Sequence, residues 1–344
     1  MVDVTVRGAG IFGLSVAWVC ARRGARVQVI DPHGPGAGAS GGIVGALAPH
    51  VPENWNPKKQ FQLDSLLMAQ AFWAEVEAVG GGDAGYARLG RVQPIADDPQ
   101  LARARMRCDT AETLWDGAAT WAVRRADDLK HWTPPSASGW VICDTLSARV
   151  HPRRACAALS AGLAVLGAPV QPDGTERGVV VEATGAAGLQ TLSARMGRPV
   201  GTAVKGQAAL LAFAAPQAPQ VFVDGLHLVP HGDGTLAVGS TSERTFEEAT
   251  TVDAQLDDVL HRARAAMPVL QDAPVLERWA GLRPRAKSRA PILGPHPLDP
   301  GRYIANGGFK IGFGMAPKAA EALADLILEN RDTIPADFRP ETCL

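Results

Sequence analysis

Apolar and polar residues alternate at the start of the chain. Val2, Val4 and Val6 alternate with Asp3 and Thr5, a period of two that predicts a β-strand. A helical run is expected over 14–23, closed by Gly24 as its C-cap, and a second β-rich segment over 26–30. The chain therefore opens with a strand–helix–strand unit.

The same patterns predict elements along the rest of the chain. Helical periodicity covers four further stretches, 63–79, 100–115, 152–166 and 319–328. Strands are expected over 87–96 and 179–182, and two β-rich runs around the turn 232–234 predict a hairpin within 228–241. Helices and strands mix throughout, so the prediction is an α/β protein.

Composition limits the class of protein. The 344 residues are enough for about two domains. With 46% hydrophobic and 20% charged residues, the chain is predicted to be soluble and globular, which excludes a disordered or fibrous protein. The net charge of -1 argues against a general nucleic-acid or membrane-surface binder, so nucleic acid is an improbable partner.

The cysteines and the apolar stretches indicate in which cellular compartment the protein is expected. The five cysteines are scattered, without spacing that suits zinc, so no metal is expected and a reducing cytoplasm is predicted. No stretch reads as a membrane span, and the early strand leaves no room for a signal peptide. A cytoplasmic location is the resulting prediction.

The first strand is followed by a dinucleotide-binding pattern, G-x-G-x-x-G over 8–13. Gly8 allows a tight turn, Gly10 lets a pyrophosphate approach the helix N-terminus, and Gly13 lets the helix lie close to the sheet. Asp31 ends the second strand, where it can accept both hydroxyls of an adenosine ribose, and it disfavours the 2′-phosphate of NADP.

A run of small residues lies just beyond the second strand. Residues 34–50 are almost all Gly, Ala, Ser and Pro, and such a backbone can pack against a bulky ligand and offer it N–H donors. Ile43, Val44 and Leu47 within the run argue against a flexible linker.

These motifs resemble the FAD-dependent D-amino acid oxidase superfamily, which includes glycine oxidase, sarcosine oxidase and D-amino acid dehydrogenases. Four later segments resemble the family in the same order, 179–185, 205–207, 228–241 and 306–317. The cysteine that holds flavin covalently in sarcosine oxidases has no counterpart, so the resemblance implies noncovalent FAD. The implied FAD contacts are Gly8, Gly10, Ile11, Phe12, Gly13, Asp31, Ala39, Ser40, Gly45, Ala183, Thr184, Gly185, Gly308, Lys310, Ile311 and Gly312.

The resemblance also implies the domain organisation. It predicts a Rossmann-type FAD-binding domain, with an interleaved α+β substrate domain built on an antiparallel sheet. The expected FAD-binding ranges are 1–51, 146–200 and 279–344, and the expected substrate-domain ranges are 52–145 and 201–278. Two departures stand out: Arg7 replaces an aliphatic residue at the end of the first strand, and 167–179 is too short for the β-meander of related proteins.

Oxidation of an amino acid needs a cation for the substrate carboxylate, best supplied by a bidentate arginine. Arg283 lies in Trp279-Ala280-Gly281-Leu282-Arg283-Pro284, which resembles the family segment with that arginine, and Lys310 occupies the position of a second carboxylate-binding cation. His50 ends the flavin-side loop and could line the pocket. The active-site tyrosine of D-amino acid oxidases has no clear match, although Phe222 and His227 lie near its place.

The leading hypothesis is FAD-dependent oxidation of glycine, sarcosine or a small D-amino acid. Hydride transfer from Cα to flavin N5 would give an imino acid and, with oxygen as acceptor, hydrogen peroxide.

Three alternatives stay open: oxidation of a 2-hydroxy acid, oxidation of an amine on modified tRNA, and a non-catalytic flavin-binding module. The basic run 277–289 leaves room for a larger anionic substrate. Oxygen as acceptor and the oligomeric state stay undetermined.

Overall fold

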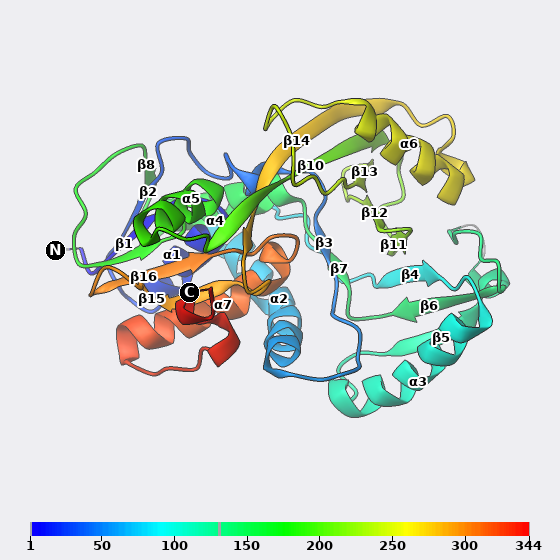
Figure 1. Ribbon diagram of the computed structural model, residues 1–344, viewed down its shortest axis with the longest axis horizontal. Coiled ribbons are helices and arrows are strands. Elements are labelled where there is room, and N and C mark those ends of the chain that lie inside the picture. The colour runs from blue at the N-terminus through cyan, green and yellow to red at the C-terminus, as the bar shows by residue number, and fades with distance from the viewer. Residues whose placement is uncertain (1, 130–131, 344) are drawn as a thin grey trace.

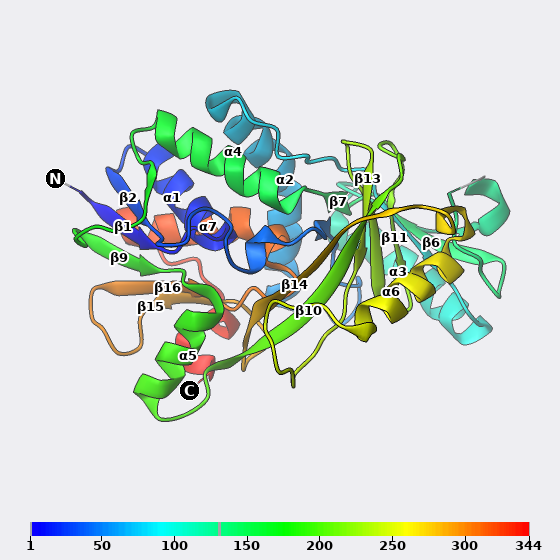
Figure 2. The same cartoon turned by 90° about the horizontal axis from the view of Figure 1, so that it is seen from above.

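The computed structural model describes residues 2–129 and 132–343, which form two bodies, each built on its own sheet (Figure 1). Two long antiparallel strands, β10 (Gly201–Ala212) and β14 (Val275–Ala286), run from one body into the other (Figures 1 and 2). A two-stranded ladder of β3 (Ala46–Leu47) and β7 (Ala148–Arg149) lies between the bodies. The predicted combination of a Rossmann-type domain with an antiparallel-sheet domain is confirmed.

The first body is built on a six-stranded sheet. In spatial order its strands are β15 (Ile292–Pro295), β16 (Arg302–Asn306), β9 (Val179–Glu182), β1 (Val4–Arg7), β2 (Val27–Ile30) and β8 (Val170–Gln171). All neighbours are parallel except β15 and β16. Valines of β1 and β9 are buried because helices cover both faces, as expected for a parallel sheet.

Helices cover the two faces of this sheet unequally. The larger layer consists of α1 (Ile11–Arg22), α2 (Pro57–Gly80), α4 (Pro152–Val165) and α7 (Gly312–Glu329), which pack on one another in a single apolar core. The other face carries α5 (Gly185–Met196), whose Leu189 and Leu192 pack against Ile292 and Ile304. Figure 2 shows α5 across the sheet from α1 and α7.

The shortened segment after β8 crosses the α5 side of β1. Thr5 Oγ1 donates to the carbonyl of Arg177 at 2.7 Å and accepts from its N–H at 3.0 Å. Arg7 pairs with Glu176 at 3.0 Å, and Glu176 also pairs with Arg302 of β16. Residues 172–178 thus form a strap in place of the missing meander, and Arg7 holds this strap on the sheet.

The second body is an eight-stranded sheet covered by two helices. Its spatial order is β14, β10, β13 (Thr235–Gly239), β12 (Leu226–Pro230), β11 (Gln220–Val223), β4 (Arg91–Pro94), β6 (Trp140–Asp144) and β5 (Trp121–Arg125). Apolar side chains of α6 (Ala254–Ala266) pack on β10 to β13, and α3 (Asp98–Trp115) packs on β5. The predicted hairpin is present as β12 and β13.

Several predicted boundaries were wrong. Helix α7 begins at Gly312, seven residues before the expected start, and keeps Pro317 inside it. Strand β4 covers only part of 87–96. Helix α2 begins at Pro57 because Asn56 caps it, with its side chain accepting from the N–H of Lys59.

The division into domains by residue range remains a prediction, and the structure differs from it in two places. The expected boundary at 278/279 falls within β14. Helix α2, expected in the substrate domain, packs on α4 and α7 of the first body. Among the described residues, no helix is both long enough and apolar enough to cross a bilayer.

Candidate active site

The turn after β1 brings the two ends of the glycine motif into backbone contact. A Cβ on Gly13 would lie 1.9 Å from the carbonyl oxygen of Gly8, and one on Gly8 would lie 2.4 Å from that of Ala183 at the end of β9. Gly8 also has φ of 102°, which other residues rarely adopt. The turn therefore requires glycine at both positions.

The helix that follows this turn presents a free N-terminus. The N-cap of α1 is Gly10, which offers no capping side chain, and the first turn holds no acidic residue. Ile11 N–H donates to Ser40 Oγ at 2.9 Å, so the second glycine-rich loop reaches the same helix end. Free N–H groups and the helix dipole make this end a ready anion site, as a pyrophosphate requires.

Asp31 lies beside this turn. Its carboxylate accepts from the N–H of Ala9 at 2.7 Å and from that of His33 at 2.9 Å. A carboxylate has about four lone-pair directions, so two remain for the expected ribose hydroxyls.

The other expected FAD residues lie around the same turn. Gly185 begins α5 and accepts from Asn306 Nδ2 at 2.9 Å, and a Cβ on Gly308 would lie 2.9 Å from Phe12 Cζ. Helix α7 begins after Lys310 and Ile311 and, like α1, has neither a side-chain cap nor an acidic residue in its first turn. Two uncapped helix N-termini and a glycine-lined backbone fit a dinucleotide.

Gly45 and Ala39 lie in the loop beyond β2. Ala39 opens a short 3₁₀ turn, Ala39–Gly41, that contains Ser40. Gly45 precedes β3, and a Cβ there would lie 1.6 Å from Val150 O. Gly45 is therefore needed for packing on the segment after β7.

Strand register defines the face of the second sheet that carries Arg283. A row of directly paired residues crosses five strands: Trp279, Ala208, Gly239, His227 and Phe222. Paired residues point to the same side of a sheet, and so do residues two apart along one strand. Arg283, four residues beyond Trp279, therefore projects from the same face as His227 and Phe222.

Arg283 is held on this face by its neighbours. Its guanidinium lies over Gly206, where a Cβ would come within 1.7 Å of Nη1. It donates to Ser240 Oγ at 2.8 Å and to Thr241 O at 3.3 Å. Burial lowers the pKa of Arg283 to about 10, against the attraction of Glu243, so the group stays charged at neutral pH.

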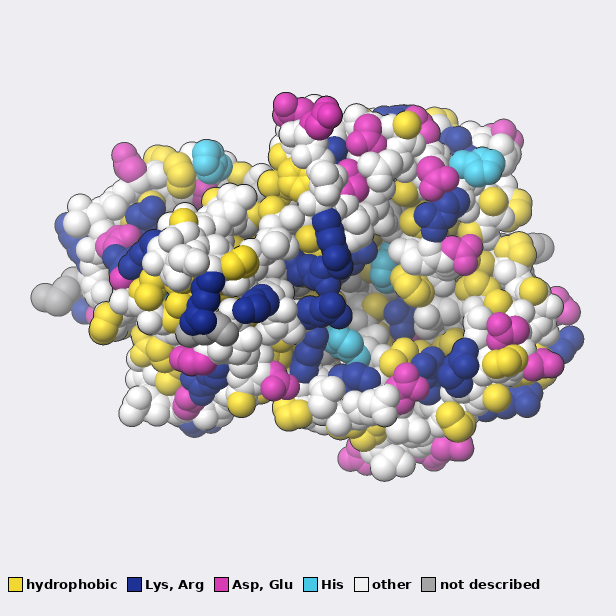
Figure 3. Space-filling model, viewed as in Figure 1, with side chains coloured by type: hydrophobic (Ala, Val, Ile, Leu, Met, Phe, Trp, Pro, Cys, Tyr) yellow, Lys and Arg dark blue, Asp and Glu magenta, His cyan; other side chains and the backbone are white. Residues whose placement is uncertain are grey.

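Lys310 reaches the same site from the turn before α7. Phe309 N–H donates to the carbonyl of Pro284, the residue after Arg283, so Lys310 follows a residue that is bound to this end of β14. Partial burial lowers the pKa of Lys310, and the positive charge of Arg283 lowers it further. Lys310 forms no hydrogen bond or ion pair with any residue that the structure describes. Figure 3 shows Lys and Arg side chains gathered along one wall of the central hollow.

His50 is held by α2. Its N–H donates to Gln62 Oε1 at 2.7 Å, and its ring Nδ1 contacts the same oxygen. Burial lowers the pKa of His50, so the ring is neutral at pH 7. No interaction described in the structure joins His50 to Arg283 or Lys310.

His227 also lies in this site. The sequence indicated only that it is near the place of the tyrosine found in D-amino acid oxidases. Gln220 Nε2 donates to the carbonyls of Leu47 and Ala148, so its Oε1 is left as the acceptor for His227 Nδ1 at 3.2 Å. Nδ1 must then carry the proton, and Nε2 keeps a lone pair. Burial lowers the pKa of His227 to about 3, helped by Arg91 and Lys310, so the ring is neutral.

His231 follows β12 in the hairpin and is buried. Only 1% of it is exposed, and its Nε2 lies 3.0 Å from Ile43 O, which makes Nε2 the donor. Burial lowers the pKa of His231 to about 4.

Acid is expected to destabilise the fold through these histidines. Between the unfolded pKa of 6.5 and the folded pKa of about 4, the unfolded chain binds a proton that folded His231 does not. Stability therefore falls as pH drops through this window, by roughly 1.4 kcal/mol per pH unit. Urea unfolding with saturating FAD at pH 7.5 and 5.5 measures the fall. His231→Gln should make the loss of unfolding free energy between these two pH values smaller by about 1.4 kcal/mol. If the variant loses as much stability as the parent, the acid sensitivity does not come from His231.

Two other features lie away from this site. Glu182, His296 and Asp299 are close enough to hold a metal, but Arg302 pairs with Glu182 at 3.0 Å and Arg195 with Asp299 at 2.6 Å.

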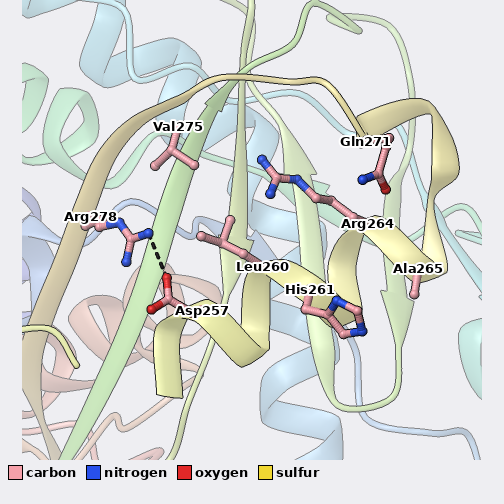
Figure 4. Close-up of a pocket in the computed structure, with 8 residues that line it drawn as sticks. All are labelled: Asp257, Leu260, His261, Arg264, Ala265, Gln271, Val275 and Arg278. Carbon is pink, nitrogen blue, oxygen red and sulfur yellow. Dashed lines mark hydrogen bonds and ion pairs between the residues drawn. The ribbon is translucent and has the colours of Figure 1, made fainter. Parts of the chain in front are cut away.

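A cavity of about 320 Å³ opens on the α6 side of β14 (Figure 4), lined by Asp257, Leu260, His261, Arg264, Ala265, Gln271, Val275 and Arg278. Arg278 and Arg283 alternate to opposite faces of β14, so this cavity is not the Arg283 site.

Comparison with known proteins agrees with this arrangement. The family model described as FAD dependent oxidoreductase matches residues 3–326. The chain is 25% identical to glycine oxidase of Geobacillus kaustophilus, over 96% of this chain and 94% of that protein. The crystal structure of glycine oxidase from Geobacillus kaustophilus superposes with a TM-score of 0.84 at 24% identity, covering 98% of this chain and 97% of that one.

A second solved structure is similar over the whole length. Iminodiacetate oxidase from Chelativorans sp. BNC1 has a TM-score of 0.86 at 24% identity, covering 98% of this chain and 99% of that chain. The expected cofactor and class of enzyme are confirmed by the family match. The chain belongs to the FAD-dependent oxidoreductase family, and it is an FAD-dependent oxidoreductase.

Proposed function

We propose that this enzyme oxidises a small amino acid, namely glycine, sarcosine or a D-amino acid. The observation that carries the proposal is Arg283, a half-buried guanidinium on the sheet face beside Lys310. Its hydrogen bonds go to a hydroxyl and a carbonyl, not to a carboxylate. Such a group is suited to a substrate carboxylate. The names of the relatives, glycine oxidase and iminodiacetate oxidase, support an amino acid substrate.

The cofactor would lie along the glycine-rich turns. Its pyrophosphate would sit at the N-terminus of α1, beside Gly10 and Ser40, with Asp31 on the ribose. The uncapped N-terminus of α7 would face the flavin, where the helix dipole favours negative charge. Bound FAD would supply the two-electron acceptor for the hydride that the substrate Cα loses.

The chain's own residues orient the substrate for that transfer. Arg283 and Lys310 hold the carboxylate, and their positive charges favour the neutral amine over the ammonium ion. His227 Nε2 accepts a hydrogen bond from the amine N–H. As Cα loses hydride, the nitrogen lone pair forms the C=N bond, and water then hydrolyses the imino acid to an oxo acid and an amine. Oxygen, reduced to hydrogen peroxide, is the proposed final acceptor.

Replacing His227 by Asn tests the contact with the amine. The Asn amide nitrogen can keep the hydrogen bond to Gln220, whereas the Nε2 lone pair is lost. We expect kcat/KM to fall about tenfold, the value of one hydrogen bond to a group that develops charge. His261→Asn, on the outer cavity, is the matched control and should leave kcat/KM unchanged. An equal effect of both variants contradicts the role of His227.

The proposed function is tested on the purified holoenzyme. Anaerobic addition of glycine, sarcosine or a D-amino acid should bleach the flavin absorbance, and added oxygen should restore it with formation of peroxide. A flavoprotein that no amine bleaches would rule out amino acid oxidation.

A further inference from the structure

The turn before α7 packs directly on the end of β14. Phe309 N–H donates to Pro284 O at 2.9 Å, and Arg285 forms a β-bridge with Gly308. The Phe309 ring carries two cations, Arg285 Cζ at 5.4 Å and Lys310 Nζ at 5.9 Å from its centre. An aromatic face therefore gathers two positive charges beside the substrate site.

Neither cation is neutralised within the part of the chain that the structure describes. Arg285 and Lys310 form no ion pair there, whereas other arginines around β14 do: Arg278 pairs with Asp257 at 2.7 Å and Arg153 with Glu277 at 2.6 Å. The whole chain carries a net charge of -1, so this accumulation is local. Figure 3 shows the wall of the hollow with few acidic side chains among the basic ones.

Strand geometry sets the spacing between the two arginines. Arg283 and Arg285 are two residues apart on β14, so their side chains leave the same face, roughly 6–7 Å apart. Pro284, between them, has no N–H and points to the other face. Arg285 and Lys310 share the Phe309 ring, and Phe309 is hydrogen-bonded to Pro284, the residue between the two arginines. Three cations therefore form one group: Arg283, Lys310 and Arg285.

One carboxylate does not use three cations. Arg283 alone can bind a carboxylate through two parallel N–H bonds. The guanidinium of Arg285 is then left to bind a second anion. Its distance from Arg283 is one that a small molecule with two carboxylates can span.

We propose that Arg285 forms a second carboxylate subsite beside the one held by Arg283 and Lys310, and that the preferred substrate is an amino acid with two carboxylates. This inference rests on the proposed function and specifies its substrate class. The second carboxylate would lie either on an N-carboxymethyl arm or on an acidic side chain.

The test compares rate constants for anaerobic flavin bleaching by the holoenzyme. The probes are sarcosine and iminodiacetate for the nitrogen arm, and D-alanine and D-aspartate for the side chain. In at least one pair, the second-order rate constant of the dicarboxylate should exceed that of the monocarboxylate about tenfold or more. The pair that shows the preference identifies which arm carries the second carboxylate.

Arg285→Met should reduce that ratio about tenfold. Arg278→Met is the matched control, because it makes the same change on the same strand but on the opposite face, and it should leave the ratio unchanged. Should Arg285→Met fail to fold, malonate and acetate can be compared as ligands of the parent enzyme. Malonate should perturb the flavin spectrum at concentrations about tenfold lower than those at which acetate does.

Three results would overturn the subsite. One is equal rate constants within both pairs, and another is an equal effect of Arg285→Met and Arg278→Met. The third is binding of tRNA at physiological salt, measured by gel retardation and abolished by Arg285→Met, because these cations would then bind nucleic acid. Bleaching by sarcosine or D-alanine without a dicarboxylate preference removes only this inference, whereas the proposed function fails if neither these four probes nor glycine nor any other D-amino acid bleaches the flavin.

Discussion

Replacing Arg283 by Ala is expected to lower kcat/KM by two to three orders of magnitude while the protein stays yellow. The guanidinium is charged and lies half-buried over Gly206, without a hydrogen bond or ion pair to a carboxylate of the described residues. Losing a desolvated charge-assisted contact to a substrate carboxylate costs about 3–4 kcal/mol, which is a factor of about 10² to 10³. Steady-state kinetics give the loss, and the flavin absorption spectrum checks that the cofactor is retained.

Arg283→Lys separates charge from geometry. Lysine keeps the positive charge but not the two-pronged donor, so kcat/KM should lie between those of the parent and the Ala variant. If Arg283→Ala retains a third or more of the parent kcat/KM, the carboxylate must be bound elsewhere.

Replacing Gly13 by Ala is expected to abolish retention of FAD. The new Cβ would lie 1.9 Å from Gly8 O, so α1 must move away from the turn that receives the pyrophosphate. Overpacking of this kind also costs about 1–3 kcal/mol of stability. The purified variant should be colourless, and the ratio of flavin to protein absorbance measures the loss.

Gly232→Ala is the control for this substitution. Gly232 lies in the hairpin turn after β12, and the nearest atom to an added Cβ is Arg149 Nη2 at 3.5 Å, an ordinary contact. This variant should retain its FAD. Full FAD content in Gly13→Ala would contradict the tight packing of the turn.

Much of the first body could be predicted because its signals are local. The alternation before Gly8, the glycine spacing and Asp31 each lie within 30 residues, and the structure places them in one strand–helix–strand unit. The start of α7 was missed because Gly312 and Gly314 hide its periodicity and Pro317 is unfavourable inside a helix. The packing of α2 on the first body depends on contacts far apart in sequence.

The substrate site was harder to predict than the cofactor turn. Arg283 and Lys310 stood out because each lies in a family segment. The environment of His227 depends on the strand register and on the amide of Gln220, whose orientation is fixed by carbonyls of two distant segments. The second cation on the Phe309 ring becomes visible only once the turn before α7 is placed beside β14.

The glycine beneath Arg283 has a consequence for how relatives of this enzyme diverge. Any side chain at position 206 would occupy the space of the guanidinium, so Arg283 would have to leave its present place over β10. Among homologous sequences, a larger residue at 206 should accompany loss of the arginine at 283 and, with it, a change of substrate. A larger residue at this position on β10 thus identifies, from sequence, relatives in which this carboxylate anchor is lost or displaced.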